Sequence, residues 1–339
     1  MQKITIVGLG LIGASLGLAL KQANLSNIEL VGNDINSNNA SRAHKRRAVD
    51  RVEGRLERAV QGASLVIIAT PVLAIREVLS QIAPHLPEGC IVTDTGSTKS
   101  EVMAWAREFL PESVSFVGGH PMAGKEESGP DAADANLFRG CVYNIVPSIN
   151  ATETAMRSIL GLVDLVGARP FFVDAREHDG MVAAVSHLPL VASVALVDAV
   201  SGARNWREMS RLAATGFRDT TRLASGDPVM SLGICLTNGE SISHWIDQLI
   251  ESLQKYRDLL SNTDGKELQD SLARAWEARQ RWIEEAQAPP QEAIKVEVPK
   301  ASELASTLFF GESLTKRGEQ VLKRWQESQR GEPEPEPKR

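Results

Sequence analysis

A single histidine lies in a glycine-rich stretch, Gly118 to Gly124, with the sequence GGHPMAG. Histidine has the side chain whose ordinary pKa lies nearest neutrality, so His120 could accept the proton released when a substrate is oxidised. The glycines on either side allow close approaches of the backbone that larger residues exclude. An isolated histidine in such a tight loop is more often structural than catalytic, so its interpretation depends on the motifs that accompany it.

A nucleotide-binding pattern stands near the N-terminus. Gly8, Gly10 and Gly13 form G-x-G-x-x-G directly after an apolar strand pattern, and Leu11 and Ile12 open the helix that follows. In this motif the first glycine makes a tight turn, the second lets a pyrophosphate approach the backbone, and the third lets helix and strand pack closely. The helix N-terminus supplies N–H donors and a favourable dipole for phosphate. We therefore expect these five residues to bind a dinucleotide.

The choice of dinucleotide depends on Asp34, which follows the second predicted strand, 21 residues after Gly13. A carboxylate there accepts hydrogen bonds from the ribose hydroxyls and repels a 2′-phosphate, so NAD is favoured over NADP. The basic cluster at 42–47 would weaken this preference only if it folded back towards the ribose. Thr70 and Pro71 follow a further strand, at the edge where open α/β sheets bind ligands, and we expect both to border the cofactor.

Strand and helix patterns alternate over the first half of the chain, which predicts a Rossmann-type, doubly wound parallel sheet of the α/β class. The expected strands are 3–7, 28–32, 65–70, 90–94, 115–117, 142–146 and 170–173, and the expected helices are 11–22, 72–82 and 99–109. The later sequence reads as helical. The segment 187–200 is apolar on nearly every side, which predicts burial in a domain core or between subunits. Apolar residues recurring from Trp245 to Leu260 predict a core stripe.

These patterns divide the chain into an NAD-binding Rossmann domain at 1–172, an all-helical substrate and dimerisation domain at 173–288, and a segment at 289–339. The last segment combines a proline-rich linker, short amphipathic helices and a tail from 330 that we expect to be disordered. An exposed Phe309-Phe310 pair would be unfavourable, so we expect it to dock on the body of the protein or on a partner subunit.

Composition excludes several classes of protein. The 339 residues are 42% hydrophobic and 24% charged, as in an ordinary globular protein, and the net charge of −6 argues against binding to nucleic acid. Three dispersed cysteines fit a reducing compartment, and neither they nor the histidines have metal-ligand spacing, so no metal site is expected. No apolar run approaches the roughly 20 residues of a membrane span, and no signal-peptide pattern precedes the first strand. We expect a cytoplasmic protein that binds no membrane.

Six segments occur in a fixed order between Lys3 and about Leu260. They are GLGLIGASL at 8–16, ATP at 69–71, DTGSTK at 94–99, GGHPMAG at 118–124, SHLP at 186–189 and GFRDTTR at 216–222. With these segments in this order, the chain resembles the prephenate/arogenate dehydrogenase family. The glycine motif alone would not separate this family from other NAD-dependent dehydrogenases.

The resemblance implies an NAD-dependent oxidative decarboxylation of a cyclohexadienyl acid. Hydride leaves ring carbon 4, the hydroxyl on that carbon loses its proton, and the carboxylate on carbon 1 departs as CO2. The resemblance also implies that His120 accepts the proton, that Ser97 hydrogen-bonds this histidine, and that His187 contacts the substrate. Arg222 would hold a substrate carboxylate. Prephenate, giving 4-hydroxyphenylpyruvate for tyrosine biosynthesis, is the expected substrate, and arogenate, giving tyrosine, is the alternative.

Four further positions bear on the substrate. Arg218 lies four residues before Arg222 and is either a second carboxylate ligand or a surface charge, while Asp219 is expected to orient a histidine or arginine partner. Lys125 stands where some relatives carry threonine, and Glu126 stands where relatives gate the side chain of the substrate. We expect Lys125 and Glu126 to influence the choice between the keto side chain of prephenate and the amino side chain of arogenate.

Two other functions fit parts of the pattern. A β-hydroxyacid dehydrogenase also joins a Rossmann domain to helices, but it uses a lysine as acid and base, whereas this chain offers His120. A non-enzymatic NAD-binding protein would have no use for His120, His187 and Arg222 together. The extensive apolar helix after His187 favours pairing of the helical domains in a homodimer.

Overall fold

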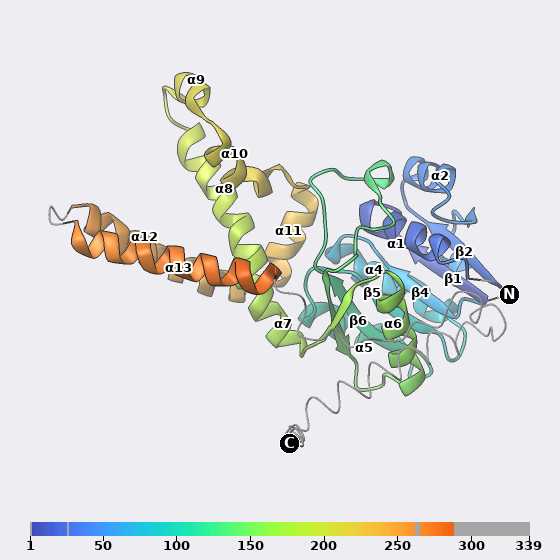
Figure 1. Ribbon diagram of the computed structural model, residues 1–339. Helices are drawn as coiled ribbons and strands as arrows, with labels where there is room; N and C mark the ends of the chain where they lie inside the picture. The colour runs from blue at the N-terminus through green and yellow to red at the C-terminus, as the bar shows by residue number, and fades with distance from the viewer. Residues whose placement is uncertain (1, 26, 262–264, 288–339) are drawn as a thin grey trace, which may run out of the picture.

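The computed structural model describes residues 2–25, 27–261 and 265–287. An eight-stranded sheet carries helices on both faces, and a series of helices then extends away from it as two arms (Figure 1). The expectations for 289–339, including the docking of Phe309 and Phe310, lie outside the described residues.

The sheet has the strand order β3-β2-β1-β4-β5-β6-β7-β8. Its strands are β1 Gln2–Val7, β2 Ile28–Asn33, β3 Arg51–Val52, β4 Leu65–Ile68, β5 Ile91–Asp94, β6 Ser115–Pro121, β7 Val142–Pro147 and β8 Arg169–Phe172. The helices between them are α1 Leu11–Gln22, α2 Ser37–Lys45, α3 Leu56–Val60, α4 Val72–Ile82, α5 Ser100–Phe109 and α6 Glu153–Leu165. The predicted α/β class with a doubly wound sheet is confirmed.

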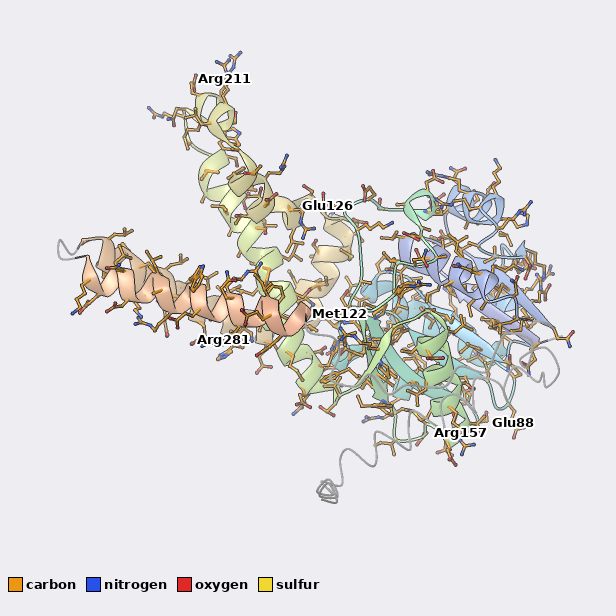
Figure 2. The ribbon with its side chains drawn as sticks, viewed as in Figure 1. Glu88, Met122, Glu126, Arg157, Arg211 and Arg281 are labelled. Carbon is orange, nitrogen blue, oxygen red and sulfur yellow. The ribbon has the colours of Figure 1, made fainter. Side chains whose placement is uncertain are left out.

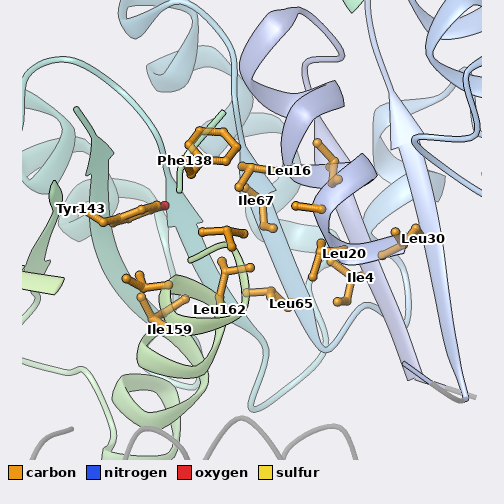
Figure 3. Packing of buried hydrophobic residues seen from close by; sticks show 14 of the residues in the cluster. Ile4, Leu16, Leu20, Leu30, Leu65, Ile67, Phe138, Tyr143, Ile159 and Leu162 are labelled. Carbon is orange, nitrogen blue, oxygen red and sulfur yellow. The ribbon is translucent and has the colours of Figure 1, made fainter. Parts of the chain in front are cut away.

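Alternate residues of the central strands enter two separate cores. In β4, Leu65 and Ile67 join the cluster packed with α1 and α6, whereas Val66 and Ile68 join the cluster packed with α4 and α5. Figure 3 shows the first of these clusters, with Leu162 of α6 beside Leu65. Because both faces of the strand are covered, every residue of it must be apolar, which explains the continuous apolar run in the sequence.

The sheet departs from the predicted parallel arrangement at one place, because β6 and β7 pair in antiparallel fashion, with His120 opposite Asn144. A parallel pair needs a crossover connection, usually through a helix that covers one face of the sheet. The connection at 122–141 contains only a single 3-10 turn, Pro130–Ala132, so no helix carries the chain back across the sheet. The chain therefore enters β7 in the reverse direction.

The first part of the glycine stretch, 118–121, belongs to β6, and only 122–124 lie in the connection that follows. The sequence pattern ends this strand at Val117, whereas the structure continues it to Pro121. A Cβ atom on Gly119 would lie 2.5 Å from the carbonyl oxygen of Asp94 and 2.9 Å from the ring of Tyr143. The loop prediction is wrong at His120 itself. The expected close approach at a glycine is confirmed, since any larger residue at position 119 would push β6 away from its neighbours.

The helical part begins with one long rod. α7 Ala175–Val182, a π-helical turn Ala183–His187 and α8 Leu188–Ser201 follow one another directly. Pro189 has no N–H group to donate, and its ring disfavours a regular α-helix in the preceding turn. In that turn the N–H of Leu188 donates to the carbonyl oxygen of Ala183, five residues earlier, which is the π-helical pattern. The irregular turn ends at His187, whose side chain is buried.

The remaining helices are α9 Trp206–Met209, α10 Thr215–Thr221, α11 Pro228–Thr237, α12 Gly239–Leu260 and α13 Lys266–Gln287, and a 3-10 turn at Arg222–Ser225 precedes α11. The outer end of α8, with α9 and α10, forms one arm, and α12 with α13 forms the other (Figure 1). Two helices of this part lie against the sheet domain, α7 near α5 and α11 near α4.

The apolar helices are not buried within one chain. In α8 only Ser193 is buried and Val194 is 41% exposed, while in α12 Leu253 is 59% exposed. The predicted core stripe is confirmed at Trp245, which packs against a small core of Ala183, Ile234 and Ile242, and is wrong towards Leu260, which is 72% exposed. Within 187–200, Leu190 and Val191 pack against the same core, so burial of the segment in a core of this chain is wrong for most of its length. Burial of 187–200 between subunits stays a prediction.

The rod formed by α7, the π turn and α8 also corrects the expectation about membrane spans. Its 27 residues, Ala175–Ser201, include a window with mean hydropathy 1.9, so it is long and apolar enough to cross a bilayer by length and composition. The sequence pattern does not reveal this length, because it predicts a separate helix over 187–200. In the structure α7 and the π turn extend that helix towards the N-terminus.

Candidate active site

The carboxyl ends of four neighbouring strands meet at one edge of the sheet. Gly8 follows β1, Thr70 follows β4, Ser97 follows β5, and His120 lies near the end of β6. Because this edge is where open α/β sheets bind ligands, the fold brings these four predicted site residues to the edge where a ligand would bind.

The glycine motif has the geometry that a bound pyrophosphate requires. Gly8 has φ +91°, and a Cβ atom there would lie 2.5 Å from the carbonyl oxygen of Ala69. A Cβ on Gly13 would lie 1.9 Å from the carbonyl oxygen of Gly8, whereas a Cβ on Gly10 would meet no described atom within 4 Å. Helix α1 begins at Leu11 without a side-chain cap, so its first N–H groups remain available for phosphate.

Asp34 is fixed beside this motif. Its Oδ2 accepts a hydrogen bond of 2.7 Å from Leu9 N, and its Oδ1 accepts one of 2.7 Å from Asn36 N. The nearby basic side chains are engaged elsewhere, since Arg42 pairs with Asp131 and Arg46 donates to the carbonyl oxygen of Ala133 at 2.8 Å. These contacts direct Arg42 and Arg46 to the 3-10 turn of the 122–141 connection.

His120 begins a buried chain of hydrogen bonds. Its Nδ1 lies 2.9 Å from Nε2 of His178, and Nδ1 of His178 lies 2.8 Å from Oδ1 of Asp179. All three residues are buried, and Asp179 also accepts hydrogen bonds from the backbone N–H groups of Lys99 and Ser100 at 2.7 and 2.8 Å. The chain therefore joins β6 to α7 and to the start of α5.

Burial sets the charge state of this chain. It lowers the pKa of His120 well below the ordinary value, and the neighbouring His178, Lys99 and His187 lower it further. For Asp179 burial raises the pKa, but the hydrogen bonds from His178, Ser100 and Lys99 outweigh burial and hold the pKa below its usual range. At neutral pH His120 is thus neutral and Asp179 is ionised.

A buried ion pair supports the backbone immediately before His120. Lys99 Nζ donates to Oδ2 of Asp94, and both side chains have no exposed surface. Asp94 also accepts from Gly96 N at 2.7 Å and from Gly119 N at 3.1 Å. Burial lowers the pKa of Lys99, and the charges of Asp94 and Asp179 oppose this shift. The pair thus ties the end of β5 to β6 one residue before His120.

His187 occupies a second buried position in the helical part. Its Nδ1 lies 3.1 Å from Nδ2 of Asn238, an amide nitrogen that also donates to the carbonyl oxygen of Asp179 at 2.8 Å. Since an amide N–H can only donate, Nδ1 of His187 accepts and the ring proton lies on Nε2. That Nε2 is buried and has no hydrogen-bond partner among the described residues. Burial lowers the pKa of His187 to about 4, so the ring is neutral.

The predicted substrate residues are brought together only in part. Nη1 of Arg222 lies 3.2 Å from Oε1 of Glu126, on the connection that faces the helical arms (Figure 2). Lys125 instead lies 3.4 Å from Asp134 and donates to the carbonyl oxygen of Ala132. Arg218 pairs with its exposed neighbour Asp219 at 3.7 Å. The structure thus joins Arg222 to Glu126 and leaves Lys125 and Arg218 outside this contact.

Ser97 is half-buried, and among the described residues it forms no hydrogen bond with His120, whose Nδ1 bonds to His178 instead. His178, Asp179 and Asn238 are not among the residues predicted from the sequence. A signal for the first two existed, since a His-Asp pair stands at the start of an apolar helical segment. Asn238 gave no signal, because its contact with His187 spans 51 residues of sequence.

Comparison with known proteins gives consistent matches along the described chain. A family model for the nucleotide-binding domain of prephenate dehydrogenase matches residues 16–172, and one for the dimerization domain of prephenate dehydrogenase matches residues 174–274. The prephenate dehydrogenase of Bacillus subtilis is 35% identical over 267 residues, which are 78% of this chain and 72% of that relative.

Solved structures agree with these matches. The prephenate dehydrogenase of Aquifex aeolicus, in complex with hydroxyphenyl propionate and NAD+, has a TM-score of 0.77 and 28% identity, covering 83% of this chain and 98% of its own. Synechocystis arogenate dehydrogenase has a TM-score of 0.69 and 30% identity, covering 83% and 100%. The resemblance inferred from the six sequence segments is confirmed, and the chain belongs to the prephenate dehydrogenase family.

Proposed function

We propose that this chain is an NAD-dependent prephenate dehydrogenase, which converts prephenate to 4-hydroxyphenylpyruvate and CO2 in tyrosine biosynthesis. The observation that carries the proposal is His120, a neutral and buried histidine at the ligand-binding edge of the sheet. Its Nδ1 is engaged with His178, while Nε2 has no hydrogen-bond partner among the described residues. A neutral imidazole nitrogen in this position can accept the proton of a substrate hydroxyl.

The N-terminal site fits NAD. The open side of Gly10 and the uncapped start of α1 suit a pyrophosphate, and the fixed carboxylate of Asp34 suits the ribose hydroxyls. The hydroxyl of Thr70 is buried without a partner among the described residues, so it can bond to a ligand at this edge. NAD+ held by these residues would supply the acceptor for the hydride that leaves ring carbon 4 of the substrate. We assign cofactor binding to Gly8, Gly10, Leu11, Ile12, Gly13, Asp34, Thr70 and Pro71.

In the proposed reaction Nε2 of His120 accepts the proton of the substrate hydroxyl as the hydride leaves the same ring carbon. The resulting ring ketone loses the carboxylate on carbon 1 as CO2, and the electron pair of the broken bond makes the ring aromatic. The proton then returns from Nε2 to the phenol oxygen. The burial that keeps His120 neutral also keeps this nitrogen able to accept the proton at neutral pH.

Arg222 is the side chain that we assign to a substrate carboxylate. A guanidinium makes paired, directional hydrogen bonds to a carboxylate, which a lysine cannot reproduce. Its present partner, Glu126, is about half exposed, so a bound substrate can compete with this carboxylate for the guanidinium. We assign His187, which carries its ring proton on the unpartnered Nε2, to a hydrogen bond with a second substrate oxygen. Ser97 is assigned to the same site beside His120.

Arogenate is the second candidate substrate, and the carboxylate of Glu126 is the feature that favours it. A carboxylate at this position attracts the ammonium group of an arogenate side chain, whereas the uncharged keto group of prephenate offers no such attraction. The similarity to Synechocystis arogenate dehydrogenase supports the same alternative. Lys125, which precedes Glu126 and pairs with Asp134, adds a positive charge and opposes this preference.

An assay of the purified full-length protein tests the proposed function. We expect reduction of NAD+ in the presence of prephenate, followed by the absorbance of NADH, and a slower reaction with NADP+ because Asp34 repels a 2′-phosphate. Parallel reactions with arogenate measure the substrate preference, and an Asp34→Asn variant should narrow the difference between the two cofactors. Absence of turnover with both cyclohexadienyl acids would rule out the function, and a faster reaction with NADP+ would contradict the role of Asp34.

We also propose that two chains pair through their helical parts. Apolar side chains that are exposed in the single chain gather on α8, α11, α12 and α13, and the family model matched there is that of a dimerization domain. A second copy that covers them would remove this surface from water, which stabilises a soluble dimer. The exposed set includes Val194, Val229, Leu232, Leu236, Ile250, Leu253, Trp276 and Trp282.

The mass in solution tests this pairing and separates it from membrane insertion of the rod Ala175–Ser201. In buffer without detergent at micromolar concentration we expect twice the 36.8 kDa of one chain. Replacing Leu253 with glutamate should shift the mass towards one chain, whereas Lys255→Glu on the same helix should leave it unchanged. A protein that stays monomeric, or that dissolves only in detergent, would contradict the dimer.

The same assignments divide the chain into two functional parts and indicate the compartment in which it acts. We assign residues 1–172 to NAD binding and 173–288 to substrate binding and pairing of subunits. A protein whose apolar helices are covered by a second copy needs no lipid, and three free cysteines suit a reducing compartment, so we place its activity in the cytoplasm.

A further inference from the structure

His178 and Asp179 stand behind His120 in a line of three buried side chains, joined by contacts of 2.9 and 2.8 Å. We propose that this pair positions His120 for catalysis by holding the proton of its ring on Nδ1, so that Nε2 faces the substrate as a bare acceptor. The inference rests on the proposed function, because it explains how His120 is kept ready to accept a proton.

The direction of the hydrogen bonds follows from the end of the line. Both oxygens of Asp179 accept backbone N–H groups, Oδ1 from Lys99 and Oδ2 from Ser100, and hydrogen bonding keeps this carboxyl ionised. An ionised carboxylate can only accept, so Nδ1 of His178 must donate to it. In a neutral His178 the other nitrogen, Nε2, is then an acceptor. Nδ1 of His120 must therefore carry a proton and donate it, which leaves Nε2 of His120 without one.

In this arrangement His178 is neutral and the carboxylate of Asp179 carries the negative charge at the end of the line. The groups packed around the two rings are the Lys99 ammonium with Asp94 at the start of α5, Asp179 on α7, and the neutral His187 at the π turn. Lys99 already brings one positive charge into a region from which water is excluded, and Asp94 neutralises it. A cationic His178 would instead donate from its Nε2 to Nδ1 of His120 and leave the proton of the His120 ring on Nε2.

The same line stabilises the state that follows proton transfer. When Nε2 of His120 takes a proton, its ring becomes a cation, and the hydrogen bond from Nδ1 to His178 becomes a charge-assisted one. The carboxylate of Asp179 lies at the far end of His178, so it compensates the new charge through one intervening ring. His178 and Asp179 touch neither substrate nor cofactor in this proposal and act only through His120.

The state of the His120 ring can be measured without any turnover. In full-length protein labelled with ¹⁵N at histidine, protonated and unprotonated ring nitrogens are well separated in the spectrum. We expect His120 to show a protonated Nδ1 and an unprotonated Nε2 at pH 7, and the signals are assigned by comparison with His120→Asn. A protonated Nε2 with a bare Nδ1 would overturn the proposal. This readout stands even if prephenate proves not to be the substrate.

Two substitutions of His178 test the effect on catalysis. His178→Phe removes the acceptor at similar size, and we expect kcat to fall on the order of 100-fold while the KM for NAD+ changes little. His178→Gln can place an amide oxygen where Nε2 lies, and we expect it to recover about tenfold of this loss. His85→Phe, at an exposed position, is the matched control and should keep the rate of the unmodified protein.

The outcomes separate positioning from folding. If His178→Phe keeps kcat within about twofold of the unmodified protein, His178 does not position His120. Equal losses in His178→Phe and His178→Gln, in folded proteins that still bind NAD+, would also overturn the proposal, because the acceptor would then have no special role. Recovery by glutamine with a protonated Nδ1 on His120 supports it.

Discussion

Replacing His120 with asparagine should lower kcat for prephenate oxidation about 10²- to 10⁴-fold, which is the range that a lost general base gives. Asparagine is the most informative substitution because its amide nitrogen can still donate towards Nε2 of His178. The hydrogen bond to His178 is therefore kept while the proton acceptor is removed. NAD+ binding should stay nearly intact, since we assign the cofactor to the start of α1 and to residues that follow β1, β2 and β4. Initial rates from NADH absorbance and titration of the bound cofactor measure the two effects.

The control for this prediction is His85→Asn, which removes an exposed histidine from the same domain. It should keep both the rate and the affinity for NAD+. If His120→Asn instead loses thermal stability, cofactor binding and activity together, His120 is a structural histidine of β6. That result would mean that His120 has a structural and not a catalytic role, and it would remove the main support for the proposed reaction.

Replacing Lys99 with methionine should lower the free energy of unfolding by about 3–5 kcal/mol, as breaking one partner of a buried ion pair does. The methionine side chain fills similar space but leaves the carboxylate of Asp94 buried with no compensating charge. Asp94 would still accept from Gly96 N and Gly119 N, so part of its hydrogen bonding remains. Denaturant unfolding, followed by a signal from the sheet domain, measures the change.

Lys21→Met provides the comparison for this second prediction. Lys21 pairs with Asp50 at 2.5 Å, but both side chains are more than a third exposed, so its loss should cost less than about 1 kcal/mol. A loss for Lys99→Met no larger than that for Lys21→Met would show that the buried pair is replaceable. Because the pair holds Gly119 next to His120, we also expect Lys99→Met to lower kcat in the fraction that folds.

The cofactor site is predictable from sequence because its parts are local. Gly8, Gly10, Gly13 and Asp34 lie within the first 34 residues, and the strand, turn and helix that hold them are specified by neighbouring residues. The contact between Gly13 and the carbonyl oxygen of Gly8 spans five residues. A local motif of this kind fixes its own geometry, so its role follows from the residue types and their spacing alone.

The surroundings of His120 could be predicted only in part. Its residue type and its glycine neighbours identified a candidate, and the six ordered segments gave the family. The antiparallel pairing of β6 with β7 made the stretch a strand, and that pairing joins residues more than twenty positions apart. His178 is 58 residues from His120 in sequence, so the hydrogen bond between them leaves no local pattern to recognise.

The sequence by itself determined the class of fold, the dinucleotide motif and the family, because each depends on residue types at short spacing or in a fixed order. Tertiary structure decided which polar side chains meet. It replaced the implied Ser97 contact of His120 with His178 and Asp179, and it joined Arg222 to Glu126. It also decided that the apolar helices α8 and α12 are not buried within one chain. The physical reason is that an apolar pattern specifies only that a surface must leave water, whereas the packing of distant segments specifies what covers it.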